Sequence, residues 1–182
     1  MILKWPFLSF FQTYCVDQQT TDSASSASAM LTGVKTIHKT VGFDHKIELG
    51  IADSISKAQK VNSLAYHAQK AGKDTGFVTT TRVTHATPSA TYAQSAHRDW
   101  ECYGDLIKDD HENTDLEKKV QDIARQLIYN EPGNKMKVMM GGGRPAFFPK
   151  SDKPKPKEGP DYDSYTWECY SNEYVHILDY IQ

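Results

Sequence analysis

The sequence predicts an α/β fold in which a mostly parallel sheet is covered by helices. Two short apolar or β-branched segments, residues 77–81 and 136–140, are separated by an amphipathic segment at residues 115–129. This alternation of strands and helices is typical of βαβ units, whose parallel strands are joined by helical crossovers. The chain has 182 residues, the length of one domain, and 38% of them are hydrophobic, which suffices for a core.

Two helices are expected before the first strand. The first runs from about Asp22 to Gly33, because an Asp-Ser pair can cap a helix N-terminus and a glycine commonly ends one. The second covers residues 51–71 and ends at Gly72. Its apolar stripe at helical spacing consists of Ile51, Ile55, Ala58, Ala65 and Ala68.

The second half of the pattern is strand, helix, strand. Residues 77–81 read Phe-Val-Thr-Thr-Thr, which predicts a short buried strand. The helix at residues 115–129 has apolar residues on one face and charged residues on the other, and Thr114 with Glu117 forms a capping box. Pro132 and Gly133 follow it, and residues 136–140 then predict a second buried strand.

The chain divides into three parts by composition. Residues 1–13 are an atypical apolar and aromatic segment without the cleavage site of a signal peptide. Residues 14–150 contain the predicted α/β core. Residues 151–182 begin as a proline-rich linker and end in an aromatic tail with a short helix expected over residues 174–180.

Charge and cysteine content narrow the function classes. The 21 Lys and Arg residues against 23 Asp and Glu give a net charge of −2, so the composition gives no electrostatic reason to expect nucleic-acid binding. No run approaches the length of a membrane span. The three cysteines, Cys15, Cys102 and Cys169, form no CxxC pair, and either one disulfide with a free thiol or three reduced thiols would fit.

The Asp22-Ser23 pair is the first candidate for chemistry. A serine at a helix N-terminus lies among amide N–H groups and at the positive end of the helix dipole, which suits an anion. Ser23 could therefore attack phosphorus, and the same amides could receive the phosphoryl group. The alternative is that Asp22 or Ser23 only caps the helix.

Two further candidates follow the first predicted strand. His85 and Thr87 are two residues apart, so in an extended segment their side chains could face one magnesium ion, Thr87 as a direct ligand and His85 through water. Arg98 could hold two phosphate oxygens in its guanidinium fork. The alternatives are a polar loop closed by Pro88 and a solvated surface arginine, and the glycines at 141–143 indicate a tight turn after a strand.

Taken together, these strings resemble the alkaline phosphatase family over roughly residues 14–150. The resemblance rests on collinear matches and is strongest for the animal type, which has a histidine at the position of His85. The matching strings are Asp22-Ser23-Ala24, Leu31 to Lys35, Val78 to Ala90, Tyr92-Ala93, Ser95-Ala96, Arg98-Asp99-Trp100 and Met140 to Arg144.

The resemblance implies a partial three-layer α/β/α sandwich and a phosphomonoesterase that uses two zinc ions and one magnesium ion. Ser23 matches the nucleophile, which forms a phosphoserine and contacts one zinc. Arg98 matches the phosphate clamp and Asp22 the aspartate that orients it. Thr87 matches a magnesium ligand and His85 a residue bound to magnesium through water.

Departures from the family pattern leave a second reading open. The aspartate expected upstream of the nucleophile and the zinc ligands expected downstream of residues 141–143 have no counterpart, so the chain resembles an N-terminal-half fragment. It could be an active phosphatase, a truncated product without activity, or a module that only binds phosphate. By resemblance we expect phosphate monoester substrates, a homodimer, and an extracellular or outer-surface location with a lipid anchor in the full-length protein only.

Overall fold

The sheet consists of two parallel strands, β1 (Gly76–Arg82) and β2 (Val138–Gly142), in a computed structural model that describes residues 10, 12–109 and 116–147. Gly76 pairs with Val138 and Val78 with Met140, and the register shifts before Arg82. The strands were predicted at residues 77–81 and 136–140, so the first is confirmed and the second begins two residues later.

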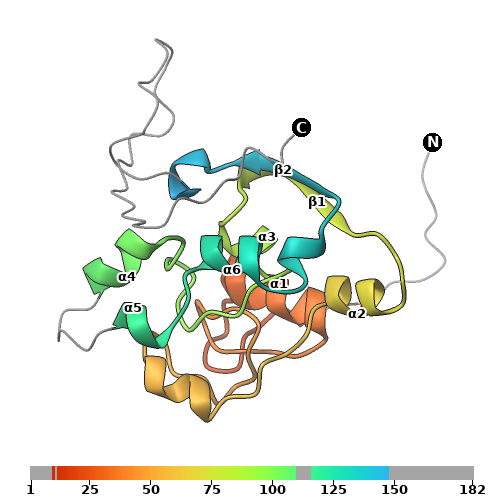
Figure 1. Ribbon diagram of the computed structural model, residues 1–182. Helices are drawn as coiled ribbons and strands as arrows, with labels where there is room; N and C mark the ends of the chain where they lie inside the picture. Colours follow the sequence, from red (N-terminus) through yellow and green to blue (C-terminus); the bar gives the residue numbers. More distant parts are fainter. Residues whose placement is uncertain (1–9, 11, 110–115, 148–182) are drawn as a thin grey trace, which may run out of the picture.

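Short helices make up the rest of the described chain (Figure 1). They are α1 (Ser23–Thr32), η1 (Ala52–Ser56), α2 (Leu64–Lys70), α3 (Ala86–Ser89), α4 (Tyr103–Asp109), α5 (Leu116–Lys119), α6 (Ile123–Tyr129), η2 (Gly133–Lys135) and η3 (Arg144–Phe147). Figure 1 shows α1, α3 and α6 on one side of the two strands, and α1 packs against α3. Strands joined by helices confirm the predicted α/β class, as an incomplete form of it.

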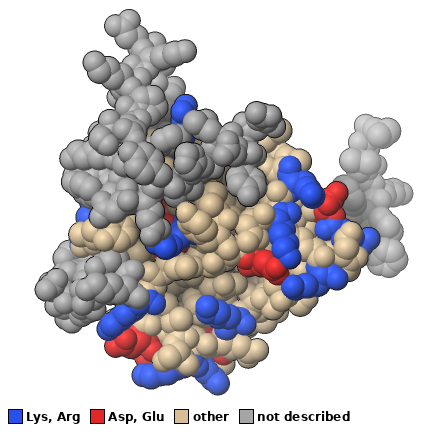
Figure 2. Space-filling model, viewed as in Figure 1, with Lys and Arg blue, Asp and Glu red and all other residues tan. Residues whose placement is uncertain are grey.

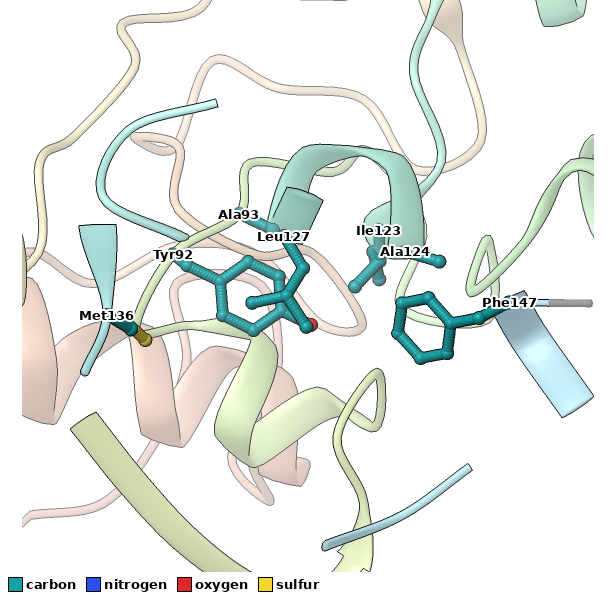
Figure 3. Close-up of a cluster of buried hydrophobic side chains, with 7 residues drawn as sticks. All are labelled: Tyr92, Ala93, Ile123, Ala124, Leu127, Met136 and Phe147. Atoms are coloured by element: carbon teal, nitrogen blue, oxygen red, sulfur yellow. The ribbon is translucent and has the colours of Figure 1, made fainter. Parts of the chain in front are cut away.

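The core beneath the strands is built mainly from α6 and the segment after α3 (Figure 3). Tyr92 stacks on Phe77 of β1 with ring centroids 6.0 Å apart, and its hydroxyl donates to the Val83 carbonyl oxygen at 2.8 Å. The buried members of this cluster are Tyr92, Ala93, Ile123, Ala124, Leu127, Met136 and Phe147. These contacts place α6 against the inner face of the sheet.

The prediction that both strands are buried was wrong for the described part of the molecule. Val78 is 73% exposed and Met140 is 60% exposed, whereas Phe77 and Met139 pack on the core. Side chains alternate between the two faces of a strand, and only the inner face is covered by described helices. Parallel sheets usually have both faces covered, and in the described part of this sheet the outer face exposes Val78, Val138 and Met140.

The helix predicted over residues 51–71 is interrupted. It consists of η1 and α2, because the residues between them pair with another segment: Phe43 and Lys60 form an antiparallel bridge, and Val61 N–H donates to the Gly42 carbonyl oxygen. Ser63 then caps α2 by accepting a hydrogen bond from Tyr66 N–H at 3.3 Å. Tertiary hydrogen bonds therefore override the local helical pattern here.

The helix predicted over residues 115–129 is also divided, into α5 and α6. Asp122 caps α6 by accepting from Arg125 N–H at 2.7 Å, and the carbonyl oxygens of Trp100 and Glu101 accept from the N–H groups of Ile123 and Ala124. These tertiary partners fix the start of α6 at residue 123 rather than at residue 115. Thr114 of the predicted capping box lies outside the described residues, as do residues 151–182 with the expected helix at 174–180.

Three further observations concern the surface and the cysteines. No described helix has the length and apolar character needed to cross a bilayer. Lys and Arg side chains lie among Asp and Glu side chains on the face shown in Figure 2, and the expectation that the chain does not bind nucleic acid stays a prediction. Cys15 is a buried free thiol.

Candidate phosphate site

Helix α1 positions Ser23 at its first turn. The boundaries predicted for this helix are confirmed: Asp22 is the N-cap in extended conformation, and Gly33 is the C-cap in left-handed conformation with φ 76°. The Asp22 carboxylate accepts from Ala24 N–H at 3.1 Å and from Ser25 N–H at 3.2 Å. Ser23 is therefore held at the N-terminus of a ten-residue helix, where the dipole favours negative charge.

The amides of this turn are not all free, which corrects the expectation that they could receive a phosphoryl group. Asp22 occupies the N–H groups of Ala24 and Ser25, and the Ser25 hydroxyl also donates to it at 2.6 Å. Among these first amides, the N–H of Ser23 itself is the one that Asp22 does not occupy. An anion at this turn would meet that N–H and the Ser23 hydroxyl.

Arg98 lies directly against this turn, although it is 75 residues from Ser23 in the sequence. Its Nη1 donates to Asp22 Oδ2 at 2.9 Å and to Ser23 Oγ at 2.8 Å. The side chains of Arg98 and Asp22 are only 17% and 11% exposed, so the ion pair is partly shielded from water. The structure thus brings together three residues that the sequence singled out separately.

The ionisation of Asp22 is set by its hydrogen bonds. Burial raises the pKa of this carboxyl, but bonds from the Ser25 hydroxyl and from the N–H groups of Lys39, Ser25 and Ala24 outweigh burial and hold the pKa well below its usual range. Asp22 is therefore a carboxylate at any pH near neutrality. Its charge orients the Arg98 guanidinium and neutralises one side of it.

His85 also reaches the guanidinium. It precedes the four-residue helix α3 in extended conformation, and its Nε2 lies 3.2 Å from Arg98 Nη2. Burial lowers the pKa of the His85 ring, with the Glu101 carboxylate opposing the shift. A neutral ring can accept the Arg98 hydrogen bond at Nε2.

Thr87 is not drawn into this cluster. The sequence placed His85 and Thr87 in an extended segment, but Thr87 lies within helix α3 and is exposed, so that expectation was wrong. His85 is the extended N-cap of this helix and Thr87 is its second residue, so the two do not share one extended strand. The structure brings His85 to Arg98, and the described contacts include no hydrogen bond from the Thr87 side chain to either of them.

An ion-pair cluster beside the site was missed from the sequence. Arg82 donates to Glu101 from Nε at 2.9 Å and from Nη2 at 2.6 Å, and the Thr84 hydroxyl donates to the same carboxylate at 2.6 Å. Burial raises the pKa of Glu101, but the bonds from Arg82 and Thr84 outweigh it, and the pKa lies below its usual value. The available signal was only an Arg at the end of a strand and a Thr two residues later in the following turn.

The glycines at residues 141–143 form the end of β2 and the turn after it, which fits the predicted strand-to-loop turn. Gly143 has φ 93°, and a Cβ on Gly141 would lie 2.7 Å from Thr79 Cγ2. These glycines permit close approach of β2 to β1. They make no phosphate loop with the Ser23 turn among the described contacts.

The described residues do not fit a complete zinc or magnesium site. No group of three or more His, Cys, Asp or Glu side chains in the described part of the chain could hold a metal ion. Ser23 and His85 both contact Arg98, and Thr87 is an exposed residue of α3. What these residues do assemble is a cation, a hydroxyl and a helix N-terminus, which suits binding of a tetrahedral anion.

Comparisons with known proteins agree with this reading of the sequence. The family model described as alkaline phosphatase matches residues 2–176. The chain is 44% identical over 157 residues to the tissue-nonspecific alkaline phosphatase of Gallus gallus, covering 85% of this chain and 29% of that protein. It is 37% identical to the human tissue-nonspecific isozyme, covering 95% of this chain and 33% of that protein.

Solved structures give the same result for the fold. Alkaline phosphatase from the Antarctic bacterium TAB5 matches with a TM-score of 0.52 and 26% identity, over 75% of this chain and 30% of that chain. The chain spans about a third or less of the length of the relatives it matches. Because the family model covers nearly all of its sequence, the chain belongs to the alkaline phosphatase family.

Proposed function

We propose that the cluster of Asp22, Ser23 and Arg98 is the phosphate-binding and nucleophilic part of an alkaline phosphatase site. The activity would be hydrolysis of phosphate monoesters through a phosphoserine at Ser23. The observation that carries this proposal is the contact of Arg98 Nη1 with Ser23 Oγ at 2.8 Å, which puts a nucleophile beside a guanidinium. Membership of the family supports the same reaction.

The residues would share the work as follows. Substrate phosphate would take the place of His85 at Arg98 Nη2, while Asp22 keeps Nη1 in position. Ser23 Oγ would attack phosphorus and lose its proton, the P–O bond to the leaving group would break, and the alkoxide would take up a proton as the alcohol. Attack of water on the phosphoserine would then release phosphate and restore the Ser23 hydroxyl.

Two zinc ions and one magnesium ion are proposed as cofactors by family resemblance, with Ser23 contacting zinc, Thr87 contacting magnesium and His85 reaching magnesium through water. Metal ions in such sites lower the pKa of a nucleophile and stabilise a leaving alkoxide. A histidine-to-aspartate variant of the TAB5 enzyme, 25% identical to this chain, is described as holding magnesium in a site designated M3. Since the described residues do not assemble such a site, no step above is assigned to a metal.

A second function, phosphate binding without turnover, is favoured by one observation. The Asp22–Arg98–Ser23 contacts are formed within the described residues, whereas Thr87 is exposed and makes no described hydrogen bond with them. On that reading the chain would hold phosphate at the α1 N-terminus and would hydrolyse nothing. The two functions share every anion-binding residue and differ only in turnover.

One experiment separates them. The chain is assayed for p-nitrophenyl phosphate hydrolysis with added zinc and magnesium, beside its Ser23→Ala and Ser26→Ala variants. Ser26→Ala is the matched control, because the Ser26 hydroxyl lies in the same helix but donates to Thr21 Oγ1 at 3.2 Å. A rate lost only in Ser23→Ala supports the phosphatase. No rate, with phosphate binding that Arg98→Ala abolishes, supports the second function. No rate and no binding would overturn both.

Location and assembly are proposed from the same resemblance. We propose an extracellular or outer-surface protein that forms a homodimer and does not bind nucleic acid. One relative, 41% identical to this chain, is the membrane-bound alkaline phosphatase of Bombyx mori. Fractionation of expressing cells and sedimentation of the purified chain test location and assembly.

A further inference from the structure

The backbone of Lys39 is unusual. With φ 62° it is the one non-glycine residue with positive φ among the residues that the structure describes. The left-handed region is unfavourable for a residue with a Cβ, and residues held there collect at functional sites. The hydrogen bonds of the Lys39 main chain explain why this conformation is kept.

Lys39 contacts both partners of the Asp22–Arg98 ion pair through its main chain. Its N–H donates to Asp22 Oδ1 at 3.1 Å, and its carbonyl oxygen accepts from the Arg98 N–H at 2.8 Å. The first bond holds the carboxylate that orients the guanidinium, and the second holds the backbone from which the guanidinium extends. One residue therefore fixes the two ends of the ion pair relative to each other.

The turn that contains Lys39 is tied down on both sides. The buried hydroxyls of Thr36 and Thr40 are 2.6 Å apart, and His38 N–H donates to Asp17 Oδ1 at 2.7 Å. Beyond the turn, Val41 and Ser95 exchange two backbone hydrogen bonds of 2.9 Å each. These contacts hold the backbone at Lys39, so its N–H and carbonyl point in the two directions that Asp22 and Arg98 require.

We propose that Lys39 is a positioning residue of the phosphate site and that its left-handed main chain sets the placement of Arg98 against Ser23. This inference rests on the proposed function of that site. Within the described residues the Lys39 ammonium forms no hydrogen bond or ion pair, so the role belongs to the backbone and not to the side chain. Residues that accept positive φ should therefore substitute for Lys39 without loss of the site geometry, and β-branched residues should disturb it.

The test compares Lys39→Gly, Lys39→Asn and Lys39→Val in the full chain. Gly72→Val is the matched control, because Gly72 has φ 75° and open space around it but lies after α2, away from the site. Two quantities are measured on folded protein: affinity for inorganic phosphate by calorimetry, and hydrogen exchange of the Arg98 amide by NMR. The exchange rate reports the bond to the Lys39 carbonyl without any ligand.

We expect Lys39→Gly and Lys39→Asn to match the wild type in both measurements. Lys39→Val should weaken phosphate binding by at least about tenfold and accelerate Arg98 exchange, whereas Gly72→Val should change neither. Wild-type behaviour of Lys39→Val, or equal losses in Lys39→Gly and Lys39→Val, would overturn the proposal. If the wild type binds no phosphate, the proposed function fails, and the Arg98 exchange rates alone decide the role of Lys39.

Discussion

Arg82 and Glu101 form a two-point ion pair across the molecule, with Nε to Oε2 at 2.9 Å and Nη2 to Oε1 at 2.6 Å. Arg82 ends β1, and Glu101 follows Arg98 by three residues. The pair therefore connects the carboxyl end of the strand to the segment that carries the phosphate clamp. This is a bidentate guanidinium–carboxylate pair, the strongest form of such an ion pair.

Replacing Glu101 by Gln should destabilise the fold. The Arg82 and Glu101 side chains are 33% and 12% exposed, so replacing two partly shielded charge-assisted hydrogen bonds by weaker neutral ones should cost about 1 to 3 kcal/mol. Urea unfolding measures it. Asp53→Asn is the control, because Asp53 pairs with Lys119 at 3.2 Å but is 77% exposed, so its loss should not change the unfolding midpoint. Equal effects of both variants would contradict a special role for Glu101.

Replacing Arg98 by Lys should weaken phosphate binding while keeping the charge. An ammonium can bond Asp22 or phosphate but cannot hold Asp22, Ser23 and an anion in one plane, so affinity should fall by about tenfold or more. Calorimetry with inorganic phosphate measures this. Arg125→Lys on the exposed side of α6 serves as the control, and an unchanged affinity in Arg98→Lys would contradict the fork geometry.

The elements that the sequence predicted well are those with local signals. Helix α1 begins after Asp22 and ends before Gly33 because both caps are made by these residues themselves. Residues 51–71 and 115–129 were predicted as single helices and are each divided, since partners from distant segments take their backbone groups. The Phe43–Lys60 bridge and the Trp100 carbonyl at the start of α6 leave no trace in local periodicity.

The candidate site shows the same difference between features with a local signal and features set by distant segments. Asp22, Ser23 and Arg98 were identified by residue type and resemblance, and the structure places them in contact. Lys39 could not be identified, because it acts through main-chain groups that any residue has. Glu101 could not be assigned to Arg82 either, because a separation of 19 positions in the sequence gives no measure of distance in space.

One added methyl group should have different effects at two neighbouring glycines of β2. A Cβ at Gly141 would lie 2.7 Å from Thr79 Cγ2 and 2.9 Å from Val83 Cγ1, whereas at Gly142 the nearest atom would be 3.5 Å away. Gly141→Ala should therefore cost about 1 to 3 kcal/mol through overpacking, and Gly142→Ala should be tolerated. Thermal unfolding of both variants measures this, and equal midpoints would show that β1 and β2 can separate freely.

Asp105 of α4 should make the fold less stable as the pH rises. It is 7% exposed, and its Oδ1 has no hydrogen-bond partner in the described part of the chain, while Oδ2 accepts from Cys102 N–H at 3.1 Å. Burial raises the pKa of this carboxyl to about 6, with the Cys102 N–H opposing the shift. This carboxyl is neutral in the folded state at mildly acid pH. When the pH rises, ionising it in its buried position costs free energy.

The sign of the pH dependence follows from the raised pKa. Because the folded-state value of about 6 exceeds the unfolded value of 3.8, the contribution of Asp105 to stability is complete below pH 3.8 and is lost as the pH rises through 6. The loss should be about 2 to 3 kcal/mol. Urea unfolding between pH 4 and pH 7.5 should show a smaller decline for Asp105→Asn than for the wild type, because the amide cannot ionise. Parallel curves would mean that water reaches the carboxylate and that its burial carries no penalty.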